Sequence, residues 1–326
     1  MSATLNDIAK KSGISISTIS RVLNGKAEKF RIAEETAQRV LRTAEELHYR
    51  PNQLARGLRL KKTHTLGLLV PDISNPFFAY ITRSVQRVAH KLGYSLIVCD
   101  TDDNLESEEE HLSLLTSKGV DGLIIMPIGQ KCGHIKSAID KGLPVVLMDR
   151  SFDDLKTNWV VVDNYTGAFK AVEHLITFGH TRIAIIQGLP DTSTNDARVN
   201  GYKDALAKHN IAIDVSLIVG NDYRKENGYI ETKFLLNLLS PPTAIFTTSD
   251  LITLGALQAL SEEKHIIPKD VSIVSFDDID FAPYLLAPLT TVRQPKEVMG
   301  EIAVKLVVED IKSGGKREKS KIVLQP

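Results

Sequence analysis

The 326-residue chain contains only two cysteines, Cys99 and Cys132, and they form no CxxC pair. The sequence therefore predicts neither a disulfide framework nor a zinc site. It also contains no run of eighteen apolar residues, and its first residues, MSATLNDIAKKSG, lack the apolar segment of a signal peptide. These absences predict a cytoplasmic protein without a membrane segment.

The sequence lacks the short motifs of common enzymes as well. It has no GxSxG nucleophile motif and no P-loop, and a long loop, DTSTNDAR, is expected after IAIIQG where a dinucleotide-binding fold would have GxGxxG. The histidines are scattered without metal-ligand spacing. We therefore expect no enzymatic activity, no cofactor and no metal. An enzyme with Asp149 or Asp277 as its acid or base is the alternative.

Charge is unevenly distributed along a chain whose formal net charge is zero. Residues 1–62 contain 13 Lys and Arg against six Asp and Glu, so they carry a formal charge of +7 and the rest of the chain −7. Lys and Arg that neutralise phosphates supply most sequence-independent affinity for DNA. The basic N-terminal part therefore predicts a polyanionic partner, and a merely solvated basic surface is the alternative.

Two short helices are predicted near the N-terminus. Thr4 and Asp7 have the spacing of a capping box, and Gly13 can take the positive φ of a sharp turn. Ser15 is a suitable N-cap for the second helix. Helical periodicity then turns Ile19, Val22 and Leu23 inward and leaves Ile16, Ser17, Ser20 and Arg21 facing outward.

Small polar side chains and an arginine on the second of two helices fit the major groove of DNA. Arg21 can reach a guanine edge or a phosphate, and the exposed Ile16 can meet a thymine methyl group. Packing of Ile16 against a neighbouring loop is the alternative. A third helix, from Glu34 to His48, is expected to complete the core with Val40, Leu41, Ala44 and Leu47.

From Thr65 onward, short apolar runs alternate with amphipathic helical stretches. The runs are LGLLV, LIVCD, GLIIMP, VVLMD, VVVD, IAIIQG, TAIFTT and VSIVSFDD. Continuous Leu, Ile and Val runs predict strands buried on both faces of parallel sheets, with crossover helices such as one from Phe77 to Leu92. The expected fold is an all-α helix-turn-helix headpiece followed by an α/β part with parallel sheets.

Polar residues or turns follow several of these runs: PDISNP at 71–76, Asp149–Arg150, Asp163–Asn164, Ser249–Asp250 and Asp277–Asp278. Ligands of open α/β sheets bind at the carboxyl ends of the strands. Asp and Asn there can bind hydroxyl groups, and the aromatic residues Phe77, Phe78 and Tyr223 can stack on a sugar or a base. Each position alone fits a helix cap or a core role better, but their recurrence predicts a small-molecule pocket.

Two segments, TLNDIAKKSGISISTISRVLNG and EETAQRVLRTAEELHYRPNQLARGLR, closely resemble the headpiece of the LacI family of bacterial transcription regulators. Residues 25–32 form a longer loop than in most members, similar to the fructose-repressor branch. The segments NPFF, VEHLITFGHTRIAIIQG, ARVNGYKDAL, PPTAIFTTSDLITLGAL and VSIVSFDDIDFAPYLLAPLTTVRQP are similar to a type I periplasmic-binding-protein core. The resemblance implies a two-lobed core and a repressor whose affinity for double-stranded operator DNA is controlled allosterically by a small molecule.

On the DNA side, the resemblance implies that Ile16 and Ser17 read bases, that Arg21 contacts DNA and that Thr4 and Asn24 hold the backbone. Residues 51–59 are too short for a stable isolated helix. The resemblance implies that they form a hinge helix on DNA and that a leucine wedges into the minor groove. A polar linker is the alternative. The remaining expected DNA contacts are Ser15, Ser20, Asn52, Ala55 and Leu58.

In the core, the resemblance implies that Arg198 grips the effector. The expected effector contacts are Phe77, Phe78, Asp163, Arg198, Tyr223, Ser249 and Asp277. A sugar is the expected effector, with a sugar phosphate or a purine as alternatives. A transport-type sugar-binding protein would explain the core but neither the basic headpiece nor the missing signal peptide.

The sequence predicts three parts. They are a DNA-binding domain at 1–50, a hinge at 51–63 and an effector-binding and dimerisation core at 64–326. We expect the first lobe of the core at about 64–163 plus 292–322 and the second at about 164–291. A homodimer is the expected assembly, with a tetramer as the alternative.

Overall fold

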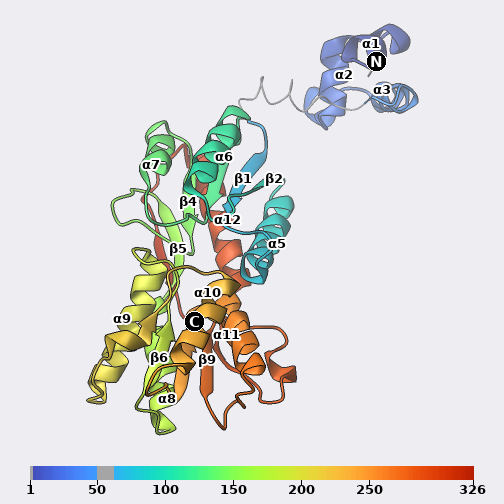
Figure 1. Cartoon of the computed structure of the whole chain (residues 1–326). Helices are drawn as coiled ribbons and strands as arrows, with labels where there is room; N and C mark the ends of the chain where they lie inside the picture. The colour runs from blue at the N-terminus through green and yellow to red at the C-terminus, as the bar shows by residue number, and fades with distance from the viewer. Residues whose placement is uncertain (1–2, 50–61) are drawn as a thin grey trace. The chain divides into compact units, whose positions relative to one another are not determined.

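A computed structural model describes residues 3–49 and 62–326 of the chain. The chain divides into two compact units, residues 1–63 and 64–326, which we call the headpiece and the core (Figure 1). The predicted hinge contacts Asn52, Ala55 and Leu58 lie outside the described residues.

The headpiece consists of α1 (Leu5–Ser12), α2 (Ile16–Leu23), the short 3-10 helix η1 (Glu28–Phe30) and α3 (Glu34–Glu46). The predicted capping box is present, since Thr4 N–H donates to Asp7 Oδ2 at 2.8 Å and Asp7 N–H donates to Thr4 Oγ1 at 3.4 Å. Gly13 ends α1 with a φ of +69°, as the turn between the helices requires. Ser15 caps α2 by accepting a hydrogen bond from Thr18 N–H.

The buried cluster of the headpiece joins all three α-helices. It consists of Ile8, Ile14, Ile19, Val22, Ala37, Val40 and Ala44. The prediction that Leu41 faces this buried cluster is wrong, because its side chain is 47% exposed. The inward stripe of α3 follows Ala37, Val40 and Ala44, and Leu41 lies one residue off that stripe. The helix also ends at Glu46, two residues before the predicted end.

The first lobe of the core contains a six-stranded parallel sheet in the order β11-β5-β4-β3-β1-β2. Helices α5 and α12 pack on one face and α6 and α7 on the other (Figure 1). The strands are β1 (Thr65–Val70), β2 (Ser95–Asp100), β3 (Gly122–Ile125), β4 (Val145–Met148), β5 (Asn158–Val162) and β11 (Lys321–Leu324). The helices are α5 (Pro76–Lys91), α6 (Leu105–Ser117), α7 (Gly133–Asp140) and α12 (Lys296–Ser313).

The second lobe contains a five-stranded parallel sheet in the order β10-β9-β8-β6-β7. Helices α8 and α9 cover one face and α10 and α11 the other. The strands are β6 (Ile183–Ile186), β7 (Ile218–Val219), β8 (Ala244–Thr247), β9 (Ser272–Phe276) and β10 (Thr290–Val292). The helices are α8 (Asn164–Thr177), α9 (Ser193–Lys208), α10 (Lys225–Leu236) and α11 (Asp250–Glu262), with 3-10 helices η2 (Val215–Leu217) and η3 (Ala282–Tyr284).

The chain passes from the first sheet to the second between β5 and α8 and returns between β10 and α12. The prediction of a two-lobed α/β core with parallel sheets is therefore confirmed. None of the described helices combines the length and the apolarity needed to span a bilayer.

Two details of the predicted elements are wrong. The run LIVCD forms β2, which is not buried on both faces, because it is an edge strand paired only with β1 and leaves Ile97 38% exposed. The segment DTSTNDAR is not a long loop. Helix α9 already begins at Ser193, so Arg198 projects from a helix.

Helices α10 and α11 approach each other closely at two glycines. A Cβ added at Gly228 would lie 2.0 Å from the carbonyl oxygen of Ile252, and one added at Gly255 would lie 1.9 Å from the carbonyl oxygen of Lys225. Such distances are far inside van der Waals contact, so glycine is required at both positions. This crossing fixes the relative position of the first turns of the two helices, which line the pocket described below.

Candidate functional site

One face of the headpiece carries five of the seven predicted DNA contacts that lie within the described residues. They line a hollow of about 430 Å³ formed by Leu5, Ile16, Ser17, Ser20, Arg21, Asn24, Lys26 and Phe30, which we call the reading face. Ile16 is 46% exposed, as predicted from the periodicity of α2. The amide of Asn24 donates to Ser20 O at 2.5 Å, which ties the end of α2 to its preceding turn. Thr4 and Ser15 do not line the hollow and instead cap α1 and α2.

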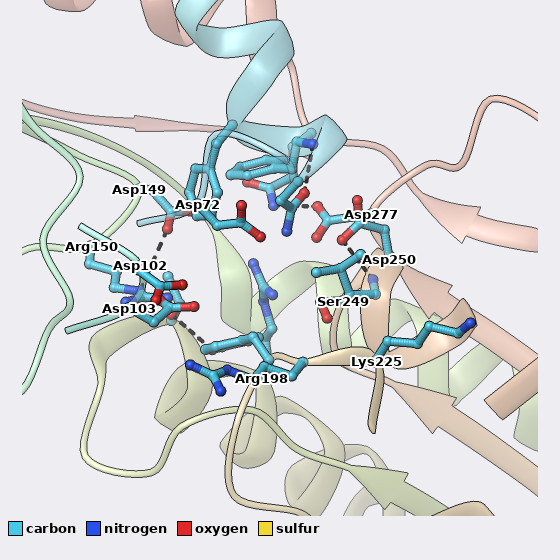
Figure 2. Close-up of a pocket in the computed structure, with 18 of the residues that line it drawn as sticks. Asp72, Asp102, Asp103, Asp149, Arg150, Arg198, Lys225, Ser249, Asp250 and Asp277 are labelled. Atoms are coloured by element: carbon cyan, nitrogen blue, oxygen red, sulfur yellow. Dashed lines mark hydrogen bonds and ion pairs between the residues drawn. The ribbon is translucent and has the colours of Figure 1, made fainter. Parts of the chain in front are cut away.

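The core contains a pocket of about 220 Å³ where strand ends of the two lobes meet. Asp149 and Arg150 follow β4 of the first lobe, and Asp277 follows β9 of the second. In Figure 2 these two groups lie on opposite sides of the pocket, with Ser249 and Asp250 beside Asp277. The other lining residues are Asp72, Asn75, Phe77, Phe78, Asp102, Asp103, Thr194, Arg198, Tyr223, Arg224, Lys225, Glu226, Leu251 and Gln294.

The pocket brings together six of the seven predicted effector contacts: Phe77, Phe78, Arg198, Tyr223, Ser249 and Asp277. It does not include Asp163. The Oδ1 atom of Asp163 accepts a hydrogen bond from Thr166 N–H at 3.0 Å, so its carboxylate caps α8. The next residue, Asn164, is the one that contacts the pocket arginine. The position of Asp163 at a strand end, taken alone, favoured a cap over a ligand contact, and the structure has the cap.

Arg198 is almost completely buried, with 3% of its surface exposed. Its Nε–H donates to Asn164 Oδ1 at 2.8 Å and its NH1 group donates to Thr248 O at 2.5 Å. The guanidinium carbon lies 3.8 Å from the centroid of the Phe276 ring. These contacts fix the guanidinium in one orientation, which suits directional hydrogen bonding to a ligand.

Arg150 approaches the pocket from the first lobe. Its NH1 group donates to Pro127 O at 3.1 Å and to Ile128 O at 2.5 Å. Its guanidinium carbon lies 5.2 Å from the ring centroid of Tyr223, which belongs to the second lobe. Sequence reasoning placed Arg150 at a strand end but did not select it as a contact, because the register of the opposing lobe is not visible in the sequence.

Asp149 and Asp277 have left-handed backbones, with φ of +67° and +75°. Non-glycine residues rarely adopt this conformation, and such strain concentrates at functional sites. Burial raises the pKa of both carboxyl groups, although nearby Arg150 and Arg198 lower the pKa of Asp149 and Arg198 also lowers that of Asp277. Buried carboxyl groups of this kind gain from a ligand that hydrogen-bonds to them.

Gln294 extends the set of polar groups and was missed from the sequence. Its Nε2 donates to Asp277 Oδ1 at 2.6 Å, and its buried Oε1 has no hydrogen-bond partner among the described residues. A buried unsatisfied acceptor is costly, so a hydroxyl or amine of a bound ligand fits beside it. Gln294 follows β10 at the return crossing between the lobes, so no strand-end run marks it.

The carboxyl group of Asp250 is expected to make the stability of the core depend on pH. Burial, followed by the neighbouring Asp277 carboxylate, raises its pKa from 3.8 to about 7. The folded protein therefore keeps a proton on Asp250 at pH values where the unfolded chain has released it. This contribution of Asp250 to the free energy of unfolding is complete below the pKa of the unfolded chain and is lost as the pH rises through about 7. We expect Asp250→Asn to reduce the fall in melting temperature of the ligand-free protein between pH 5 and 8 by a few degrees. An unchanged pH slope in thermal unfolding would refute this assignment.

Comparison with known proteins agrees with this geometry. Residues 4–52 match the bacterial regulatory proteins of the lacI family, and residues 63–325 match the periplasmic binding proteins and sugar binding domain of the LacI family. The ribose operon repressor of Haemophilus influenzae is 37% identical over 328 residues, which cover 99% of this chain and 96% of that protein. The chain belongs to the LacI family. It is therefore a DNA-binding transcription regulator controlled by a small molecule, and not an enzyme.

Solved structures of LacI-family proteins have the same fold. The Lac repressor dimer bound to operator and the anti-inducer ONPF has a TM-score of 0.87 at 25% identity, covering 100% of this chain and 97% of that one. A LacI-family regulator from Enterococcus faecium with bound ribose has a TM-score of 0.72 at 31% identity, covering 80% of this chain and 95% of that one. The Lac repressor agrees over the whole length of this chain and supports the order of headpiece and core expected from the sequence.

Proposed function

We propose that this LacI-family regulator is a repressor that senses a neutral monosaccharide in the core pocket. The pocket lining contains seven carboxyl groups but only four basic groups. An anionic ligand such as a sugar phosphate would place further negative charge beside carboxyl groups that already outnumber the basic groups. The hydroxyl groups of a free sugar can hydrogen-bond to carboxyl groups in either protonation state. This excess of acceptors is the observation that carries the proposal.

Pocket size and aromatic placement support the same ligand. The volume of about 220 Å³ is below the range of about 300–1,000 Å³ typical of pockets for drug-sized ligands. Phe77 and Phe78 supply apolar ring surface beside the acidic groups, with their centroids 5.1 Å apart. A sugar offers both an apolar ring face and hydroxyl groups to such a site, while a purine would leave more of the carboxyl groups without donors.

Two relatives indicate ribose as the first sugar to test. One is named a ribose operon repressor and the other was solved with bound ribose. Titration calorimetry should show binding of D-ribose, or of another free pentose or hexose, at least about tenfold tighter than of the corresponding sugar phosphate or of hypoxanthine. Tighter binding of the phosphate or the purine would refute the proposed effector class while leaving the family assignment intact.

On the DNA side, we propose that the reading face contacts operator bases. Ile16, Ser17 and Arg21 would meet base edges, while Ser20 and Asn24 lie beside them, and Thr4 and Ser15 would support the contact as helix caps. Asn52, Ala55 and Leu58 would contribute from a hinge at 51–63, between a DNA-binding domain at 1–50 and the core at 64–326. A homodimer acting in the cytoplasm on a two-fold operator fits this arrangement, as in the Lac repressor dimer.

Arg21→Ala tests the reading face. A well-placed arginine contact with a base contributes about 1–3 kcal/mol of discrimination. We therefore expect the variant to lose about tenfold or more in operator affinity and much less in affinity for random duplex. Gel shifts at fixed salt measure both affinities. Equal losses of affinity for the operator and for random duplex would show that Arg21 contacts phosphates and not bases.

A further inference from the structure

Phe30 lies on η1, in the loop that follows α2, with 43% of its surface exposed. Its ring is not part of the buried cluster of the headpiece. The guanidinium carbon of Arg21 lies 4.1 Å from the ring centroid, well within the distance of about 6 Å over which a cation is attracted to an aromatic face. Packing in the buried cluster of the headpiece therefore does not explain why a phenylalanine is present at position 30. Its contact with Arg21 places the ring on the reading face.

Backbone hydrogen bonds hold the loop in place. Helix α2 ends in a Schellman motif, in which Lys26 N–H donates to Arg21 O and Gly25 N–H to Val22 O, both at 2.9 Å. Gly25 supplies the required positive φ of +67°. Phe30 N–H then donates to Lys26 O at 3.2 Å. The backbone that carries the ring is thus held in place relative to the helix that carries Arg21.

Ala27 and Ile32 strengthen this attachment. Ile32 N–H donates to Ala27 O at 3.0 Å, and both side chains pack against the buried cluster of the headpiece. The loop is therefore anchored to the buried cluster of the headpiece on both sides of Phe30. A ring on a loop that is held in this way can restrict the motion of the neighbouring Arg21 side chain.

The charge of Arg21 is available to a ligand. Within residues 3–49, the ion pair that forms is between Lys11 and Glu46, and it does not involve Arg21. An exposed arginine ordinarily loses rotamer freedom when it binds DNA. The Phe30 ring covers one face of the guanidinium, while N–H groups in the guanidinium plane can still donate to a base edge.

We propose that Phe30 is a positioning residue for DNA recognition, whose ring orients the Arg21 guanidinium on the reading face before DNA binds. Phe30, Arg21, Ile16 and Ser17 line the same hollow. The inference rests on the proposed base contact of Arg21 and adds the extended loop as a determinant of specificity. It assigns a function to residues 25–32.

The test uses the full chain and the palindromic duplex that it selects from a random library. Phe30→Ala should weaken binding of that duplex by roughly tenfold, and Phe30→Tyr, which keeps the ring, should restore affinity to within about twofold of the original. In duplexes with single base-pair changes, Phe30→Ala should lose discrimination at the same base pair as Arg21→Ala. Because the two residues act together, adding Phe30→Ala to Arg21→Ala should cause little further loss.

Leu41→Ala is the matched control, because Leu41 is also about half exposed in the headpiece but does not line the reading face. It should leave DNA affinity unchanged. Unchanged binding by Phe30→Ala, equal losses in Phe30→Ala and Phe30→Tyr, or a full further loss in the double variant would each overturn the role of Phe30. Unchanged binding by Arg21→Ala would overturn the proposed base contact and this inference together, whereas a defect in Arg21→Ala alone would overturn only the inference.

Discussion

Replacing Arg198 with alanine is expected to abolish the response to the effector. The guanidinium is buried, hydrogen-bonded to Asn164 and Thr248, and close enough to Asp149 and Asp277 to affect the pKa of both. Its removal takes away one of the positive charges that compensate these two buried carboxyl groups. Affinity for the monosaccharide that binds the original protein should fall by at least about 100-fold in calorimetry, since truncating a buried charged partner costs about 2–5 kcal/mol.

The same substitution should lower stability by roughly 3 kcal/mol, because two buried carboxyl groups lose a charged partner. Arg198→Lys separates the two effects. It keeps a positive charge near the carboxyl groups but loses the planar set of donors that bonds both Asn164 and Thr248. We expect it to recover most of the melting temperature and little of the effector affinity. Effector affinity within a few-fold of the original in both variants would show that Arg198 is a structural residue only.

Replacing Gly255 with alanine is expected to destabilise the core by about 3 kcal/mol. The new Cβ would lie 1.9 Å from Lys225 O and 2.6 Å from Tyr229 N, both backbone atoms of α10. Neither atom can be relieved by a side-chain rotation, so α10 and α11 must move apart. Chemical denaturation should show the loss, and effector affinity should fall as well because the first turns of both helices line the pocket.

Gly133→Ala provides the control for the expected effect at Gly255. Gly133 is also helical, at the first position of α7, but a Cβ added there would meet nothing within 4 Å. Alanine should therefore be neutral or slightly stabilising, by about 0.5 kcal/mol, because it restricts the unfolded chain. If Gly255→Ala proved as harmless as Gly133→Ala, the close helix crossing would not exist in solution.

The sequence predicted where helices and strands form better than it predicted which side chains they bury. Apolar runs marked eight of the eleven described strands but not β7, β10 or β11. Capping residues marked the start of α1 and α2, because such signals are local. The exposure of β2 depends on its place at the edge of the sheet, and the exposure of Leu41 on a difference of one residue in helical register. Neither is determined by the local composition.

The sequence also predicted most of the effector pocket, with six of the seven expected contacts lining it. Strand-end polarity and aromatic residues pointed to Phe77, Phe78, Tyr223, Ser249 and Asp277, because carboxyl ends of parallel strands share one edge of a sheet. Resemblance to the family was needed for Arg198, which projects from a helix. The same rule wrongly selected Asp163, since a carboxylate before a helix also serves as a cap, and it could not find Gln294 at the crossing between lobes.

The bond between Arg198 and Asn164 has a mechanical consequence. Asn164 is the first residue of α8, directly after the chain has left the first sheet. A ligand that contacts this guanidinium is therefore one hydrogen bond away from the connection between the two sheets.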